Sequence, residues 1–303
     1  MKILLFGKSG QLGWELQRSL LPLGELVALE PGSRELCGDF TRLNDIRETV
    51  RTAAPAVIVN AAAYTAVDKA ENEPEHVRII NALAPAALAS EAAKLGALLV
   101  HYSTDYVFDG SGDRPRDETD PVGPLNVYGT TKLEGEAAII SSGCSYLIFR
   151  TSWVFAARGE NFAKKILRLA QERDRLTIVD DQVGAPTGAE LLADVTAHAI
   201  RMALQHPELN GLYHLVASGE TSWCGYARFV LDFARQAGIR LKTGPRDLVP
   251  VPSSAFPSPA RRPKNSRLNT VKLGSAFGLK LPPWQAGVAR MLTETLENHH
   301  DRA

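Results

Sequence analysis

The type of fold is indicated by Ile3-Leu-Leu-Phe-Gly7-Lys-Ser-Gly10-Gln-Leu-Gly13, near the start of the sequence. A short apolar run ends in glycine, and the helical pattern Gln11–Leu21 follows until Pro22 stops it. Glycines at these three places permit a tight turn, let the backbone approach a pyrophosphate and let the helix pack closely on the strand. The amino end of the helix then offers unpaired N–H groups to the anion. The stretch therefore predicts a dinucleotide cofactor bound by residues of the loop and the first helical turn, namely Gly7, Gly10, Gln11, Leu12 and Gly13.

Strands and helices alternate through the first half of the chain. We expect further strands at Glu25–Leu29, Ala56–Asn60, Ala97–Tyr102 and Tyr146–Arg150. Between them we expect a helix capped by Asn44 and running to about Ala54, another from about Pro74 to Leu95, and a third from about Val127. Continuously apolar strands alternating with helices indicate a parallel sheet covered on both faces. The predicted fold class is α/β, a doubly wound parallel sheet of the Rossmann type, with ligands at the carboxyl ends of its strands.

The rhythm changes after Arg150. Helices are expected near Asn161–Glu172, Gly188–Gln205, Thr221–Gln236 and Pro283–Glu297, with short strands around Leu176–Val179 and Leu212–Val216. The proline-rich segment Leu248–Pro263 suits an ordered loop or lid more than a core element. We therefore expect a dinucleotide-binding domain of residues 1–150 plus returning segments of about 176–216. A smaller C-terminal substrate-binding domain would comprise about 151–175 and 217–303.

Composition excludes several classes of protein. The 303 residues are 45% hydrophobic with a formal net charge of zero, so the chain can bury a sizeable core and shows no basic excess for a nucleic-acid partner. No apolar run approaches membrane-spanning length, and Lys2–Phe6 is too short for a signal peptide. Three widely spaced cysteines suggest neither a disulfide framework nor a zinc cluster. We expect a cytoplasmic protein without membrane or nucleic-acid partners.

Polar residues crowd the end of the fourth strand, which reads His101-Tyr-Ser-Thr-Asp-Tyr-Val-Phe-Asp-Gly110. The later stretch Asn126-Val-Tyr-Gly-Thr-Thr-Lys132 places a phenol and an ammonium four residues apart, on one face of a helix. Reduction of a ketone needs a hydride on carbon and a proton on oxygen. Tyr128 suits the acid, Lys132 would stabilise its phenolate, and Thr104 would hold the carbonyl oxygen near it.

The glycine spacing and the order Thr104, Tyr128, Lys132 resemble the extended short-chain dehydrogenase/reductases. Glu30 ends the second strand, where an acidic side chain would bind the adenosine ribose hydroxyls and favour NADH. Lys8 and Arg34 could offset the repulsion of a 2′-phosphate, so NADH and NADPH both remain open. The resemblance also suggests that Asp39 and Phe40 flank the adenine. Cofactor contacts are further expected from Ala61, Ala62, Ala63, Tyr102, Tyr128 and Lys132.

Longer motifs narrow the resemblance. Ser103-Thr-Asp-Tyr-Val-Phe-Asp-Gly110, Leu125-Asn-Val-Tyr-Gly129, Phe149-Arg-Thr-Ser-Trp-Val154, Asp181-Gln-Val-Gly-Ala-Pro-Thr-Gly188 and Arg267-Leu-Asn269 are similar to the dTDP-4-dehydrorhamnose reductases over nearly the whole chain. The resemblance implies NAD(P)H-dependent reduction of the 4-keto group of dTDP-4-dehydro-6-deoxy-L-mannose to dTDP-L-rhamnose, the last step of that pathway. It implies substrate contacts from Thr104, Asp105, Tyr106, Tyr128 and Trp153.

The same resemblance suggests a homodimer bridged by Mg²⁺ through Glu15, Glu190 and Glu294. These glutamates lie on separate expected helices, so their spacing gives the metal no support, and solvated surface positions explain them equally well.

Two alternatives stay open. A regulatory subunit of methionine adenosyltransferase carries the same pattern and binds cofactor without turnover, although an intact Thr104, Tyr128 and Lys132 argues against it. A nucleotide-sugar epimerase or dehydratase shares the fold, but a dehydratase needs extra acid/base groups beside Thr104, and Asp105 supplies one.

Overall fold

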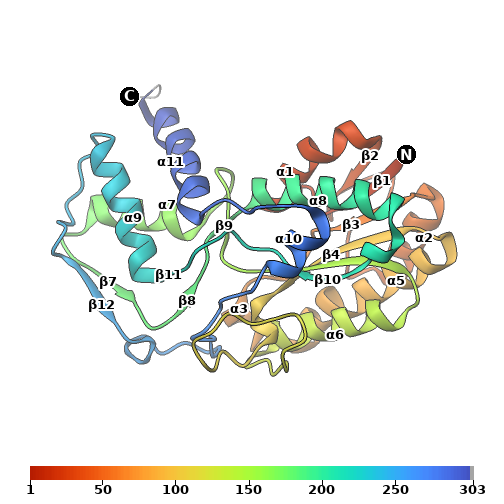
Figure 1. Ribbon diagram of the computed structural model, residues 1–303, viewed down its shortest axis with the longest axis horizontal. Coiled ribbons are helices and arrows are strands. Elements are labelled where there is room, and N and C mark those ends of the chain that lie inside the picture. Colours follow the sequence, from red (N-terminus) through yellow and green to blue (C-terminus); the bar gives the residue numbers. More distant parts are fainter. Residues whose placement is uncertain (301–303) are drawn as a thin grey trace.

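The computed structural model describes the backbone from Met1 to His300 and the side chains from Met1 to Glu297. Its centre is a six-stranded sheet with the order β10-β5-β4-β3-β1-β2, in which all neighbours run parallel (Figure 1). The strands are β1 Lys2–Phe6, β2 Glu25–Leu29, β3 Val57–Asn60, β4 Leu98–Thr104, β5 Ser145–Thr151 and β10 Gly211–His214. The doubly wound α/β fold predicted from the sequence is confirmed.

Helices cover both faces of this sheet (Figure 1). On one face lie α1 Gln11–Leu20, α8 Ala189–Gln205 and α10 Val271–Phe277. On the other lie α2 Leu43–Ala53, α5 Ala84–Leu95 and α6 Val127–Ser141. Ile3 and Leu5 of β1 point to the first face and Leu4 and Phe6 to the second, all fully buried, as a strand with two covered faces requires.

A second lobe has its own apolar core (left in Figure 1). It contains α7 Phe162–Glu172, α9 Trp223–Gln236 and α11 Trp284–His300, together with the parallel pair β7 Leu176–Val179 and β12 Leu248–Val251. Two short pairs join it to the rest, β6 Val154–Phe155 with β9 Thr187–Gly188, and β8 Val183–Gly184 with β11 Thr221–Ser222. Of the segment 176–216, α8 and β10 belong to the large lobe, whereas β7 pairs outside the main sheet.

Several local expectations differ from the structure. Asn44 is not a helix cap, because α2 already begins at Leu43 after Arg42. Pro22 does not end all helical structure but lies in a 3₁₀ turn, Leu21–Leu23, whose early positions tolerate a missing N–H. The expected helix from Pro74 is divided into α4 Pro74–Arg78, a π-helical turn Ile79–Leu83 and α5. The proline-rich segment begins as strand β12 before it becomes a loop, and α10 was not expected.

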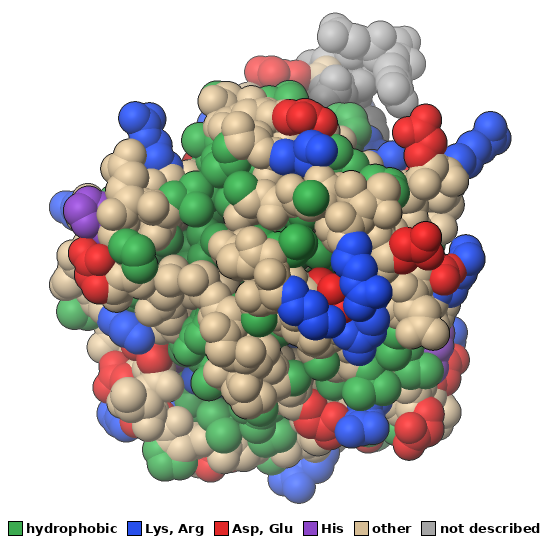
Figure 2. Space-filling view, turned by 90° about the vertical axis from the view of Figure 1, so that its right-hand side faces the viewer, with side chains coloured by type: hydrophobic (Ala, Val, Ile, Leu, Met, Phe, Trp, Pro, Cys, Tyr) green, Lys and Arg blue, Asp and Glu red, His purple; other side chains and the backbone are tan. Residues whose placement is uncertain are grey.

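Acidic and basic side chains are interspersed on the face shown in Figure 2. Elsewhere in the described structure, the buried Glu91 lies within 4 Å of Arg47, Arg51 and Lys94. Among the helices that the structure describes, none combines the length and apolar character needed to cross a membrane.

Candidate active site

The loop between β1 and α1 has the shape of a pyrophosphate cradle. Gly7 has φ +86°, and a Cβ there would lie 2.7 Å from the Ala62 nitrogen, so only glycine fits. A Cβ on Gly13 would lie 1.9 Å from the Gly7 carbonyl oxygen, which explains the third glycine as close packing of helix on loop. Gly10 precedes α1 without a side-chain cap, so the backbone N–H groups of the first turn of α1 have no side-chain partner there. Such donors at a helix amino end fit an anionic dinucleotide.

The residues expected near the adenosine lie at the end of β2 and beyond. Glu30 pairs with Lys8 at 3.5 Å, with both side chains about one-third exposed. Asp39 accepts bonds from the backbone and hydroxyl of Thr41 and is half-buried, whereas Phe40 is buried against Phe6 with ring centroids 5.3 Å apart. The Lys8–Glu30 pair places charges of both signs at one edge of the cofactor cradle.

The other residues predicted to contact the cofactor lie after β3 and on β4. The segment Ala61–Ala63 follows β3 and approaches Gly7 closely. The Tyr102 ring belongs to the core on the α8 side, where its hydroxyl lies 2.6 Å from Thr196 Oγ1. Its backbone carbonyl, in contrast, faces Lys132.

Thr104 and Tyr128 meet at the carboxyl end of β4. Helix α6 is capped by Asn126, whose side chain accepts from the Gly129 N–H at 2.8 Å. A Cβ on Gly129 would lie 2.3 Å from the Tyr106 carbonyl oxygen, so this glycine lets α6 approach the strand end. The pKa of Tyr128 is raised to about 12, mainly by burial. The charge of Asp105 also raises this pKa, whereas a hydrogen bond with Thr104 lowers it. The sequence predicts that Lys132 stabilises the phenolate, but within the described residues the pKa of Tyr128 is set by burial, Thr104 and Asp105.

Lys132 is 2% exposed and is directed into the protein. Its ammonium donates to the Tyr102 carbonyl at 2.6 Å and lies 3.2 Å from His101 Nε2. Burial lowers the pKa of Lys132 to about 8, opposed by the charge of Glu136 one turn further along α6. A lysine in this state can exchange a proton near neutral pH, which an ordinary lysine does poorly.

Asp105 and Tyr106, which directly follow Thr104, border the same site. Asp105 is 2% exposed and accepts from the Thr104 hydroxyl at 3.0 Å; burial raises its pKa to about 7, while bonds from Ser266 and Thr104 lower it. The Tyr106 ring stands edge-on to Tyr128, with centroids 5.6 Å apart. The structure thus brings Thr104, Asp105, Tyr106 and Tyr128 together, as predicted.

Trp153 lies in the second lobe and has an unusual backbone. Its φ of +50° is rare for a bulky residue and marks a strained position, as often occurs at functional sites. Its ring stacks on Trp223 with centroids 3.7 Å apart and planes 14° apart. Trp223 is held in turn by its ring N–H, which donates to Gln182 at 3.1 Å. No motif in the sequence marks Trp223 as a neighbour of Trp153.

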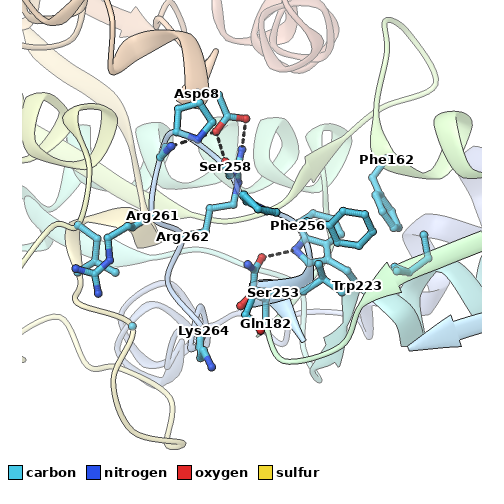
Figure 3. Close-up of a pocket in the computed structure, with 18 of the residues that line it drawn as sticks. Asp68, Phe162, Gln182, Trp223, Ser253, Phe256, Ser258, Arg261, Arg262 and Lys264 are labelled. Atoms are coloured by element: carbon cyan, nitrogen blue, oxygen red, sulfur yellow. Dashed lines mark hydrogen bonds and ion pairs between the residues drawn. The ribbon is translucent and has the colours of Figure 1, made fainter. Parts of the chain in front are cut away.

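A cavity of about 910 Å³ extends from Trp223 along the proline-rich segment, and Trp153 is not part of its wall. Its wall includes aromatic side chains (Phe162, Trp223 and Phe256) and basic ones (Lys165, Arg261, Arg262 and Lys264) (Figure 3). The wall stops short of Tyr128 and is linked to it through Tyr106, because Arg262 bonds Tyr106 and Tyr106 packs on Tyr128. The prediction of an ordered loop or lid holds only for the later part of Leu248–Pro263, which lines this cavity, because the first residues form β12.

One ion pair fastens this loop to the large lobe. Arg262 donates to Asp68 at 2.7 Å, and the Ser258 hydroxyl donates to the same carboxylate at 2.5 Å (Figure 3). Asp68 lies on the short helix α3 Val67–Ala70, and its Arg262 bond lowers its pKa to about 2. Sequence patterns carried no sign of this pair, since its members are 194 positions apart.

The three glutamates suggested as metal ligands approach one another, and Arg290 lies among them. Arg290 is 3.5 Å from Glu190 and 3.3 Å from Glu294. Burial raises the pKa of Glu190, and the charges of Glu294 and Glu15 raise it further, whereas Arg290 lowers it. Among the described residues, no three His, Cys, Asp or Glu side chains are arranged to hold a metal ion. Within one chain the residues therefore fit an arginine-neutralised cluster and do not form a magnesium site.

Comparison with known proteins agrees with this geometry. Residues 1–297 match the family described as RmlD substrate binding domain. The chain is 60% identical to the dTDP-4-dehydrorhamnose reductase of Salmonella typhimurium and 59% identical to that of Escherichia coli K12, covering 97% of this chain and 98% of each relative.

Solved structures give the same result. A dTDP-4-dehydrorhamnose reductase from Clostridium acetobutylicum superposes with a TM-score of 0.86 at 35% identity, and one from Bacillus anthracis in complex with NADP with 0.85 at 32%. Each comparison covers 97% of this chain and 99% of the other. The chain belongs to the RmlD substrate-binding domain family, the family of the dTDP-4-dehydrorhamnose reductases.

Proposed function

We propose that this protein reduces the 4-keto group of dTDP-4-dehydro-6-deoxy-L-mannose to give dTDP-L-rhamnose, with NADPH or NADH as reductant. The observation that carries the proposal is the hydrogen bond between Thr104 and Tyr128 at the end of β4, beside a cofactor cradle. The named relatives and the NADP complex of the B. anthracis enzyme support it.

When bound, the nicotinamide supplies the hydride. Thr104 and Tyr128 would hold the carbonyl oxygen between their hydroxyls, which fixes the carbon for attack. Tyr128 would give that oxygen its proton, a role in which its raised pKa keeps the phenol protonated at neutral pH. Lys132 then returns a proton to the tyrosine, which its lowered pKa favours.

The large cavity suggests how a nucleotide diphosphate is held. Arg261, Arg262 and Lys264 lie on one side of it and would neutralise the diphosphate. Phe162, Phe256 and Trp223 offer rings on which a pyrimidine base can stack. Trp153 would then contact the sugar between the base and Tyr128. We also propose a dinucleotide-binding domain, to which α8, β10 and α10 return after residue 150, and a smaller substrate-binding domain. A homodimer and a cytoplasmic location complete the proposal.

Turnover is tested by mixing the protein with reduced cofactor and freshly made 4-keto sugar nucleotide. We expect loss of the reduced-nicotinamide absorbance and formation of dTDP-L-rhamnose. No absorbance should be lost when the sugar nucleotide is omitted. Cofactor binding without turnover would instead favour a regulatory subunit. Conversion of the sugar without net oxidation of cofactor would favour an epimerase or a dehydratase.

A further inference from the structure

A chain of buried hydrogen bonds connects the loop after β3 to Lys132. The Ala62 N–H donates to Asn60 Oδ1 at 3.1 Å. Asn60 Nδ2 lies 3.0 Å from His101 Nδ1, and His101 Nε2 lies 3.2 Å from Lys132 Nζ. Asn60, His101 and Lys132 are each at most 2% exposed, so the protein groups must satisfy one another.

The directions of these bonds follow from the one group whose role is certain. A backbone N–H can only donate, so the Asn60 atom facing Ala62 is its oxygen, and the atom facing His101 is its NH₂ group. An amide NH₂ also only donates, so His101 Nδ1 must accept. Complete burial holds the pKa of His101 well below its usual range, so the ring is neutral and carries its single proton on Nε2.

That proton points at Lys132. A neutral amine can accept it with its lone pair, whereas an ammonium has no lone pair to offer. The amine form would accept from His101, donate one N–H to the Tyr102 carbonyl and keep a second N–H for a further partner. The ammonium form would point one of its own N–H groups at the Nε2–H of His101, which is repulsive. Flipping the Asn60 side-chain amide would remove this clash but would leave the Ala62 N–H without a partner.

We propose that His101 is a positioning residue, which holds the Lys132 amine and makes its ammonium a ready proton donor. This inference rests on the proposed reduction. After Tyr128 has protonated the substrate oxygen, a proton leaves Lys132 Nζ and forms the new phenol O–H. The lone pair left on Nζ then accepts the His101 N–H, and solvent later returns the proton to Nζ.

The other charged groups around Lys132 do not determine which partner donates in the bond between His101 and Lys132. Glu136 on α6 raises the pKa of Lys132, and Arg150 on β5 pairs with Glu136. Asp105, after β4, acts on Tyr128. From β3 the neutral Asn60 reaches the lysine only through the imidazole. Burial disfavours the ammonium in general, whereas His101 provides a specific bond to the amine.

The test begins with histidine tautomers, which long-range ¹H–¹⁵N spectra of ¹⁵N-histidine-labelled protein distinguish. We expect the Nε2–H tautomer for His101 in the wild type. In Asn60→Asp the carboxylate only accepts, so the proton should move to Nδ1 and Nε2 should accept from the ammonium. The Nδ1–H tautomer in the wild type would overturn the proposal, whether or not the protein turns over the sugar nucleotide; absent turnover would overturn only the proposed reaction.

Kinetics supply the second test. With Asn60→Asp, we expect the alkaline limb of the kcat profile to move up by roughly one pH unit, the scale of one buried hydrogen bond. His101→Phe should lower kcat about tenfold while leaving KM for the sugar nucleotide within about twofold. The matched control is His214→Phe. His214 lies on β10, is also fully buried, and its ring packs against Phe108. An unchanged kcat in folded His101→Phe, an unmoved limb in Asn60→Asp, or equal effects in the control would each overturn the proposal.

Discussion

Arg150 and Glu136 form a two-pronged ion pair inside the protein. Arg150 Nε lies 2.9 Å from Glu136 Oε1 and its Nη2 lies 2.6 Å from Oε2. Both side chains are at most 5% exposed. Glu136 follows Lys132 by one helical turn and raises the pKa of Lys132. The ion pair therefore connects strand β5 with the charge of the Lys132 ammonium.

We expect Glu136→Ala to lower the free energy of unfolding by roughly 3–5 kcal/mol, because it leaves a buried guanidinium without its partner. The same helix offers a matched control. Glu134 pairs with Arg78 at 2.7 Å, but the two side chains are 39% and 49% exposed, so Glu134→Ala should cost about 1 kcal/mol or less. Urea unfolding of both variants measures the difference, and similar losses would contradict the account of the buried pair.

Tyr128→Phe removes the acid and keeps the ring. Turnover should fall by roughly a hundredfold or more, the usual scale of general acid catalysis, while cofactor binding stays near wild type. Steady-state kinetics and a cofactor titration by fluorescence check both parts. Wild-type turnover in this variant would show that another group protonates the substrate.

The parallel sheet could be predicted because each strand is a short apolar run whose residues face both covered surfaces. β1 illustrates this, since Ile3–Phe6 are all fully buried. Local detail was less predictable. The π-helical turn at Ile79–Leu83 follows from tertiary packing, in which Gly135 of α6 approaches the Asn81 carbonyl so closely that a Cβ would lie 2.3 Å away. No pattern within residues 74–95 encodes that contact.

The same distinction holds for the site. Thr104, Tyr128 and Lys132 were predictable because strand-end hydroxyls and a helical i, i+4 pair leave marks in the sequence. The Asp68–Arg262 pair was not, because it depends on how the loop after β12 folds back onto α3. His101 was visible in the strand-end motif, but its role depends on Asn60, which reaches it from a neighbouring strand.

Asp105 should make stability depend on pH. Its pKa is raised to about 7 in the fold from an ordinary value of 3.8, so between these values the folded protein binds more protons than the unfolded chain. The free energy of unfolding should therefore fall as pH rises from about 4 to 7, by up to roughly 4 kcal/mol from this group. Asp105→Asn should lack this contribution. Parallel curves of unfolding free energy against pH for the two proteins would contradict it.

Glu30 should influence the choice of cofactor. Glu30→Ser removes a carboxylate and frees Lys8, now 3.5 Å from it, to approach a 2′-phosphate. The ratio of kcat/KM for NADPH to that for NADH should therefore rise. Glu25→Ser, at the opposite end of β2, serves as the control and should leave the ratio unchanged. An unchanged ratio in Glu30→Ser would place this residue away from the ribose.

Magnesium, if it acts at Glu15, Glu190 and Glu294, must act between subunits, because one chain alone offers an arginine-neutralised cluster. Carboxylates from two chains facing each other would repel unless a cation with oxygen ligands joined them. EDTA should then weaken dimerisation, measured by sedimentation, more than it weakens turnover at high protein concentration, since Thr104, Tyr128 and Lys132 belong to one chain.

Glu15→Gln should reduce the effect of EDTA on the dimer, whereas Glu208→Gln, on an exposed turn, should not. A dimer indifferent to EDTA and to Glu15→Gln would remove the ion and leave Arg290 as the neutralising charge at this surface. Turnover abolished by EDTA would instead indicate a metal in the chemistry, which proton transfer from Tyr128 does not require.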